Sequence, residues 1–426
     1  MTTFDLASAL VTLAALLAWA NHRYVRLPPT IGVMVLSMLF SLALVGMGGL
    51  GFHASEVVEG LMLDVDFSQA LLNGMLGALL FAGALHLNLN ELREKKLEIS
   101  VLATVGVLLS TAVVGVGAMV VFRALGLDVP TVYCFLFGAL ISPTDPIAVG
   151  AILKTAGVPQ SLQVKISGES LFNDGVGVVL FILILEVATG SSGHDGGSAG
   201  ASLETVLRLL AVEVGGGLLF GLAVGWIIYR LLRSVDNYQV EVLLTLAIAT
   251  GGYSLAHALH VSGPLAMVVA GLLIGNHGRL FAMSPVVVEH MYGFWELVDE
   301  LLNAVLFVLI GLEVLVLDLD ARIALAGLAA IPLVLLARFA SVGLPVSLIR
   351  PFVRFSPHAV KILTWSGLRG GISVALALSL PAGHVRDILV TVTYVVVVFS
   401  ILVQGLSVGP VARRLSGRAA GPDAAR

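Results

Sequence analysis

Charged side chains are scarce in this chain of 426 residues, because Asp, Glu, Lys and Arg together make up 12%. A soluble domain carries roughly 25%, and a water-soluble fold of this length could not cover its surface with so few charges. Basic residues do not exceed acidic ones, at 23 against 27, which argues against a nucleic-acid partner. Cys134 is the single cysteine, so an intrachain disulfide is excluded, and no Cys/His cluster predicts a metal or haem cofactor.

The chain is instead rich in long apolar segments. Hydrophobic residues make up 58% of it, and the mean hydropathy is +1.02. A membrane-spanning helix needs about 20 apolar residues, so we predict an all-α polytopic membrane protein with about 13 transmembrane helices. The expected segments lie near 4–20, 30–47, 67–87, 99–121, 131–153, 166–189, 209–232, 240–260, 262–276, 293–316, 322–349, 360–380 and 386–409.

The basic residues predict how these segments are oriented. With the N-terminus outside and the C-terminus inside, 17 of the 23 Lys and Arg residues fall on the inner side, as expected for a membrane protein whose inner loops collect positive charge. No basic residue precedes the first apolar run, and Arg23 and Arg26 follow it, which favours an uncleaved first helix over a signal peptide. We expect a multi-pass protein of the cell membrane.

The chain divides at a Gly/Ser-rich linker, residues 190–202. We expect one transmembrane domain over 1–410, followed by a short cytoplasmic tail over 411–426. Within the domain, the expected parts are a first repeat over 1–189, a linker helix over 203–233 and a second repeat over 240–410.

Two of the expected segments are interrupted in their middle. Segment five contains Leu140-Ile-Ser-Pro-Thr-Asp-Pro146, and segment twelve contains Trp365-Ser-Gly-Leu-Arg-Gly-Gly371. Proline removes a backbone donor and glycine favours unwinding, and lipid tolerates such breaks only where the backbone is buried in protein or lines a polar site. The breaks are seven segments apart, so their helices run in opposite directions. This predicts an inverted repeat with its binding site at the two breaks.

Ionisable residues gather beside the first break. Segment six contains Gly168-Glu-Ser-Leu-Phe-Asn-Asp-Gly175, in which Ser170 and Asp174 share a helix face. Asp145, next to Thr144 in the break, is the expected neighbour of Asp174. Two carboxylates, hydroxyls and freed backbone carbonyls are hard oxygen ligands that suit a small cation.

These carboxylates also bind protons, because burial favours the neutral acid while a nearby cation favours the carboxylate. Competition between a proton and a metal ion for one carboxylate is the basis of cation/proton exchange. The alternative is that Asp145 and Asp174 are structural, with backbone donors at the break satisfying them.

Two arginines lie within the expected spans. One hypothesis pairs Arg369, in the second break, with Glu169, and a competing one makes Arg369 an anion-binding group. For Arg338, in segment eleven, we expect an acidic partner on segment ten. The candidates there are Glu296, Asp299 and Glu300.

Three motifs together resemble those of the monovalent cation:proton antiporters, in the branch of NhaP-type sodium/proton antiporters and animal sodium/hydrogen exchangers. They are Ser142-Pro-Thr-Asp-Pro146, Gly168-Glu-Ser-Leu-Phe-Asn-Asp-Gly175 and Gly367-Leu-Arg-Gly370. The resemblance covers nearly the whole chain, and the short tail alone departs from the animal members, which makes tail-mediated regulation unexpected.

The resemblance implies a homodimer in which a core domain of crossed broken helices moves against a dimerisation domain. It implies Asp174 as the principal carrier of the ion and the proton, with Asp145, Ser170 and the Thr144 backbone completing the cation site and Glu169 nearby. Asn173 stands where the electrogenic branch has a second aspartate, which implies electroneutral exchange of one cation for one proton.

The sequence therefore predicts a secondary antiporter, not an enzyme, that exchanges Na⁺ for H⁺ by alternating access, with Li⁺ and K⁺ left open as the cation. Its alternative is a sodium-coupled anion symporter of related fold, in which Arg369 would hold the substrate. An intramembrane aspartyl protease would need Tyr-Asp and Gly-x-Gly-Asp motifs, and the sequence has neither.

Overall fold

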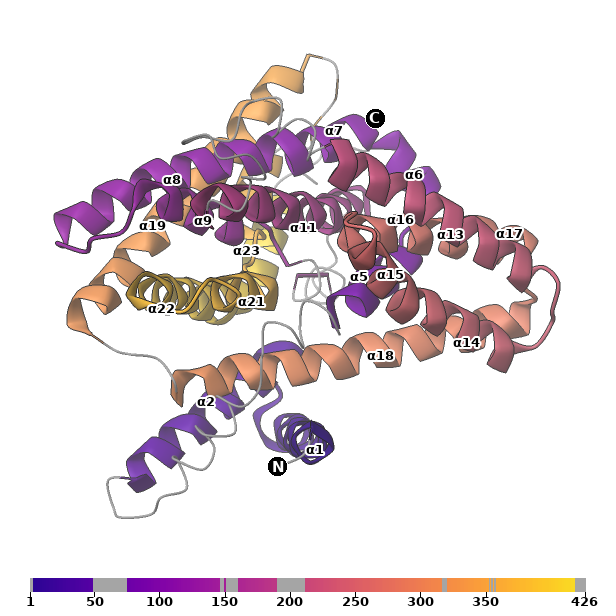
Figure 1. Ribbon diagram of the computed structural model, residues 1–426, viewed down its shortest axis with the longest axis horizontal. Helices are drawn as coiled ribbons and strands as arrows, with labels where there is room; N and C mark the ends of the chain where they lie inside the picture. Colours follow the sequence, from indigo (N-terminus) through magenta and orange to yellow (C-terminus); the bar gives the residue numbers. More distant parts are fainter. Residues whose placement is uncertain are drawn as a thin grey trace.

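The computed structural model describes residues 3–48, 75–145, 149–150, 160–189, 211–315, 320–351, 353, 355 and 358–417, and these contain helices and no strand. Eight helices within the described residues are long and apolar enough to cross a membrane. The predicted all-α, multi-pass membrane fold is thereby confirmed (Figure 1).

The helices of the first half follow the apolar segments. They are α1 (Thr3–Ala20), α2 (Pro29–Gly48), α5 (Leu76–Leu85), α6 (Leu89–Glu94), α7 (Lys96–Val101), α8 (Val107–Ala124), α9 (Thr131–Ile141) and α11 (Gln160–Thr189). A π-helical turn over Leu102–Gly106 joins α7 to α8 into one long rod.

The second half is described from residue 211 onward. Its helices are α13 (Gly216–Leu232), α14 (Tyr238–Ala247), α15 (Tyr253–Ala258), α16 (Gly263–Leu273), α17 (Arg279–Phe281), α18 (Pro285–Leu312), α19 (Ala321–Ile349), α20 (Ala359–Trp365), α21 (Gly371–Leu378), α22 (His384–Phe399) and α23 (Gly405–Gly417). A π-helical turn over Ser400–Gln404 joins α22 to α23.

Some helix bounds differ from the predicted ones. Helix α18, which corresponds to the tenth predicted segment, begins at Pro285 and not near 293. It begins there because Ser284 caps it and Pro285 suits its first turn. The last helix continues to Gly417, past the predicted domain end at 410. The predicted Gly/Ser linker, residues 67–74 of the third segment and the chain from 418 onward lie outside the described residues.

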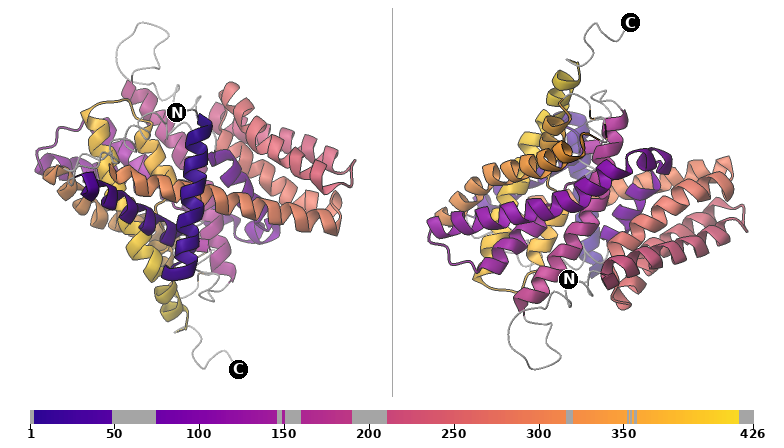
Figure 2. Two further views of the ribbon diagram at one scale, coloured as in Figure 1. Left: turned by 90° about the horizontal axis from the view of Figure 1, so that it is seen from below. Right: turned by 90° about the horizontal axis from the view of Figure 1, so that it is seen from above.

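The helices form two groups that lie at opposite ends of the molecule (Figure 1 and Figure 2). The first group contains α5 and α13–α16, whose apolar core includes Phe81 packed on Trp295 of α18. The second group contains α8, α9, α11, α19, α21 and α22, whose core includes Phe122 packed on Phe137.

The long helix α18 contacts both groups. Its first half belongs to the first core through Trp295, whereas residues from Leu306 to Leu312 pack in the second core. Three of its hydrogen bonds reach other elements: Ser37 of α2 donates to the Val308 carbonyl, Tyr292 donates to the Gly275 carbonyl in the turn that follows α16, and Trp295 donates to Thr245 of α14. Hydrogen bonding therefore ties α18 to the first group and to α2.

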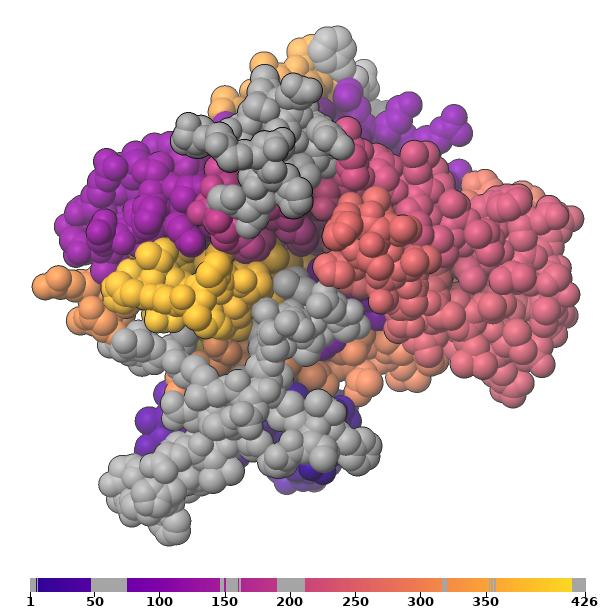
Figure 3. Space-filling model, viewed as in Figure 1, coloured from indigo at the N-terminus to yellow at the C-terminus, as the bar shows by residue number. Residues whose placement is uncertain are grey.

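The outer surface of the first group is apolar. Helices α13 and α14 form one end of the molecule (Figure 3), where Leu219, Trp226 and Leu243 are all more than half exposed. Such side chains are stable facing lipid tails, which agrees with the assignment of these helices as membrane spans.

We predict that Gly275 is required for the close approach of the helix over Gly263–Phe281 to α5. A Cβ at this position would overlap the Leu85 carbonyl oxygen, which is backbone and cannot move aside. Gly275→Ala should lower the free energy of unfolding by about 1–3 kcal/mol. Thermal unfolding in detergent measures this, with Gly293→Ala of α18 as the control, since a Cβ there meets nothing within 4 Å. Equal melting temperatures for the two variants would contradict the prediction.

Candidate functional site

The two interrupted segments meet at the centre of the molecule. Helix α9 ends at Ile141, and the second interruption lies between the end of α20 at Trp365 and the start of α21 at Gly371. The Asp145 backbone N–H donates a 2.8 Å hydrogen bond to the Leu368 carbonyl. Each interruption thus supplies a partner for backbone groups that the other leaves without a helical one.

Arg369 holds the end of α9. Its guanidinium is 1% exposed, and Nη1 donates to the carbonyls of Ser142 at 2.7 Å and Pro143 at 2.9 Å. A positive charge at the C-terminal end of a helix is stabilised by its free carbonyls. Its backbone N–H donates to Ser400 Oγ at 2.9 Å, which fixes the second interruption against the π-helical turn that follows α22.

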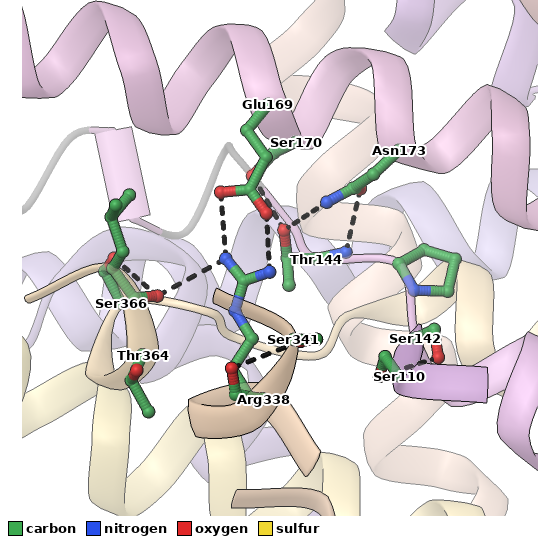
Figure 4. Close-up of polar contacts among 12 residues, drawn as sticks. Ser110, Ser142, Thr144, Glu169, Ser170, Asn173, Arg338, Ser341, Thr364 and Ser366 are labelled. Atoms are coloured by element: carbon green, nitrogen blue, oxygen red, sulfur yellow. Dashed lines mark hydrogen bonds and ion pairs between the residues drawn. The ribbon is translucent and has the colours of Figure 1, made fainter. Parts of the chain in front are cut away.

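The hypothesis that Arg369 forms an ion pair with Glu169 is wrong, because Arg338 occupies both carboxylate oxygens of Glu169 (Figure 4). Arg338 Nη2 lies 2.9 Å from Glu169 Oε2, and Nη1 bonds the other oxygen. Side-chain exposure of 7% and 1% makes this a buried bidentate pair. The expectation that Arg338 pairs with an acid of segment ten is wrong as well.

Arg338 pairs with Glu169 because α19 places its side chain between α20 and α11. Its Nη2 also lies 3.3 Å from the carbonyl of Leu363 in α20, so the side chain reaches α20 and α11 together. A Cβ at Gly367, in the second interruption, would lie 2.6 Å from Arg338 Nε. The glycine therefore leaves the space through which the arginine passes.

Three predicted site residues form one hydrogen-bonded cluster (Figure 4). Thr144 Oγ1 lies 2.9 Å from Ser170 Oγ and accepts a 2.9 Å hydrogen bond from Asn173 Nδ2. The Thr144 backbone N–H donates to Asn173 Oδ1 at 3.1 Å. Asn173, fully buried, thus uses a donor and an acceptor to hold the first interruption against α11, and an aspartate would lack the donor.

The two predicted aspartates line one cavity between the helix groups. Asp145 and Asp174 are the two acidic residues among its described lining, which includes no Lys or Arg. The other lining residues are Leu76, Leu79, Leu80, Gly83, Pro143, Leu171, Asn303, Leu306, Gly370, Gly371, Ile372 and Ser373. A Cβ at Gly370 would overlap the Asp145 carboxylate, so this glycine makes room for it.

The structure therefore brings Thr144, Asp145, Ser170, Asn173 and Asp174 together, and places Glu169 beside them in a closed pair with Arg338. Their role in holding Na⁺ stays a prediction. Sequence analysis missed Asn303, which lines the same cavity from α18. The sequence feature that could have indicated it is a polar residue within the apolar run Leu301-Leu-Asn-Ala-Val-Leu306.

Comparison with known proteins gives consistent matches over most of the chain. A family model described as "Sodium/hydrogen exchanger, transmembrane" matches residues 11–414. The chain is 49% identical to the Na⁺/H⁺ antiporter NhaP of Pseudomonas aeruginosa over 416 residues, which is 96% of each protein. It is 35% identical to the Na⁺/H⁺ antiporter NhaH of Halobacillus dabanensis, over 82% of this chain and 84% of that protein.

The fold is similar to a solved structure of the sodium proton antiporter MjNhaP1 from Methanocaldococcus jannaschii. The TM-score is 0.71 at 19% sequence identity, and the match covers 98% of this chain and 100% of the other. At this identity the likeness supports the fold alone.

We predict that Glu169 and Arg338 stabilise the protein only as a pair. Arg338→Met leaves a buried carboxylate without its partner and should cost about 3–5 kcal/mol, whereas the double variant Glu169→Leu/Arg338→Met should cost clearly less. Thermal unfolding of the single and double variants measures this coupling. Arg322→Met, at the exposed start of the same helix, is the control and should melt like the unaltered protein. Additive losses in the double variant would count against a closed pair.

Proposed function

This chain belongs to the sodium/hydrogen exchanger family, and we propose that it exchanges Na⁺ for H⁺ across the membrane as a secondary antiporter. The observation that carries the proposal is the cavity between the two helix groups, which Asp145 and Asp174 line and whose described lining contains no Lys or Arg. Carboxylates in such a place attract a small cation and bind a proton in its absence.

In this mechanism Asp174 is the principal carrier and Asp145 its partner. A cation displaces the proton from the buried carboxylate on one side of the membrane, and a proton displaces the cation on the other. Ser170, whose hydroxyl lies 2.9 Å from Thr144 Oγ1, and the Thr144 backbone complete the proposed set of oxygen ligands. Glu169 takes no part in carrying the ion, since Arg338 neutralises it.

Alternating access follows from the division of the molecule into two groups. The interrupted segments, α11 and α19 are joined by the Thr144–Ser170, Asp145–Leu368 and Glu169–Arg338 bonds, so they can move as one body. The first group, with α18, would form the stationary part and the dimer contact. In this proposal the protein is a homodimer in the cell membrane, with its N-terminus outside and its halves related by the inverted repeat.

The anion symporter is less well supported by the geometry. Arg369, its required anion-binding group, donates to the carbonyls that end α9 and is not among the residues that line the cavity. An anion in this cavity would instead meet the carboxylates of Asp145 and Asp174, which repel it.

We predict that Asp174→Asn abolishes exchange, because an amide neither releases a proton nor neutralises a cation. In proteoliposomes with a preset pH gradient, the initial rate of Na⁺-induced pH change should fall by about a hundredfold or more. Glu186→Gln, which removes a partly exposed carboxylate from the same helix, should retain normal exchange. Adding Li⁺, K⁺ and choline in turn identifies the cation.

The proposed function fails if the unaltered protein responds to no cation between pH 5 and pH 9, or if Asp174→Asn exchanges normally. Uptake of an organic anion that requires Na⁺ and is lost in Arg369→Ala would support the symporter instead.

We further predict electroneutral exchange of one cation for one proton. Asn173 is neutral and engaged with Thr144, so the proposed site carries no second aspartate at this position. The initial exchange rate should therefore be the same when the membrane potential of the vesicles is clamped at zero or at a large negative value. A rate that changes with the clamped potential would show net charge movement.

A further inference from the structure

Helix α18 brings one polar side chain, Asn303, to the cavity, and a second, Asp299, lies one helical turn before it. Asp299 and Asn303 are four residues apart and thus share a helix face. Asn303 is 2% exposed and lines the cavity that Asp145 and Asp174 line from the other helix group. Neither residue of the pair has a part in the mechanism described above.

The Asn303 side chain has an oxygen without a partner. Its Nδ2 donates a 2.7 Å hydrogen bond to the Asp299 backbone carbonyl. Because that partner can only accept, the amide orientation is fixed and Oδ1 lies on the other side of the amide. No described residue donates to Asn303 Oδ1, which is buried. A buried carbonyl oxygen left without a donor costs about 1–3 kcal/mol, so this oxygen suits a ligand.

Asp299 adds a negative charge one helical turn from Asn303. Its Oδ1 is buried and likewise has no hydrogen-bond donor among the described residues. Because of this position, its charge adds to that of Asp145 and Asp174, which line the cavity with no Lys or Arg among the other described lining residues. Together these carboxylates create negative potential that concentrates cations.

We propose that Asp299 and Asn303 form a second Na⁺ site on α18, at which the cation is recruited before it passes to Asp145 and Asp174. A carboxylate oxygen and an amide oxygen are the hard ligands that a small, weakly polarisable cation prefers. The proposal rests on the exchange function, and it assigns to α18 the capture of the cation and to Asp174 its transport.

The two roles predict different kinetic losses. Removing a group that only recruits the cation raises the Na⁺ concentration for half-maximal exchange and leaves the maximal rate intact. Asp299→Asn should raise this concentration about tenfold through loss of one charge, with the maximal rate within about twofold of normal. Asn303→Ala should raise it by a smaller factor, and Asp299→Glu, which keeps the charge, should restore most of the affinity.

Glu300→Gln is the matched control, because it removes the same charge from the next residue of α18, which is exposed. Its half-saturating Na⁺ concentration should be unchanged. Melting temperatures of all variants are compared with that of the unaltered protein, so that a loss of folded protein is not read as a loss of affinity.

Calorimetric titration of the purified proteins with NaCl provides a readout that does not need transport. Weaker Na⁺ binding in Asp299→Asn than in Glu300→Gln supports the second site even if the vesicles show no exchange. The proposal is overturned if Asp299→Asn binds Na⁺ and reaches half-maximal exchange as Glu300→Gln does, or if its maximal rate alone falls. In that outcome, exchange by the unaltered protein that is lost in Asp174→Asn leaves the proposed function standing.

Discussion

The centre of this molecule depends on one constraint, which is that backbone groups freed by a helix break inside a membrane must be bonded by protein. Two breaks satisfy each other here through the Asp145–Leu368 hydrogen bond, and Arg369 bonds the carbonyls at the end of α9. These bonds join segments more than 200 residues apart, so neither break is stable without the other. The same contacts place Asp145 in the cavity with Asp174.

The buried charges around the breaks have separate tasks. Arg369 Nη1 bonds the carbonyls at the end of α9, and Arg338 forms a closed pair with Glu169. Neither arginine is among the described residues that line the cavity. A free arginine beside the aspartates would hold them ionised and would compete with any cation. Because neither arginine lines the cavity with them, Asp145 and Asp174 are the groups to which we assign the exchange of a proton for a cation.

Local chemistry made much of this arrangement predictable from sequence. The lengths of the apolar segments predicted the membrane fold. Proline and glycine within two of these segments predicted where the helices break and which residues lie near the breaks. The partner of Arg338 was not predictable, because it depends on which face of α19 meets α11, 169 residues away along the chain. The start of α18 was missed because Glu289 and His290 interrupt the apolar residues that precede position 293.

The proposed ligands lie on two different bodies, and this division explains how one cavity could both capture an ion and move it. Thr144, Asp145, Ser170 and Asp174 come from segments that hydrogen bonds tie to one another, so a cation on these residues keeps its ligands when that body moves. Helix α18 forms its hydrogen bonds to other elements with α2, with α14 and with the turn that follows α16. It meets the other body through apolar contacts, which can slide. An ion held by both bodies would oppose the movement, since its coordination would have to break. Oxygen ligands on α18 are therefore suited to capture, and transport must begin when the cation leaves them for the aspartates.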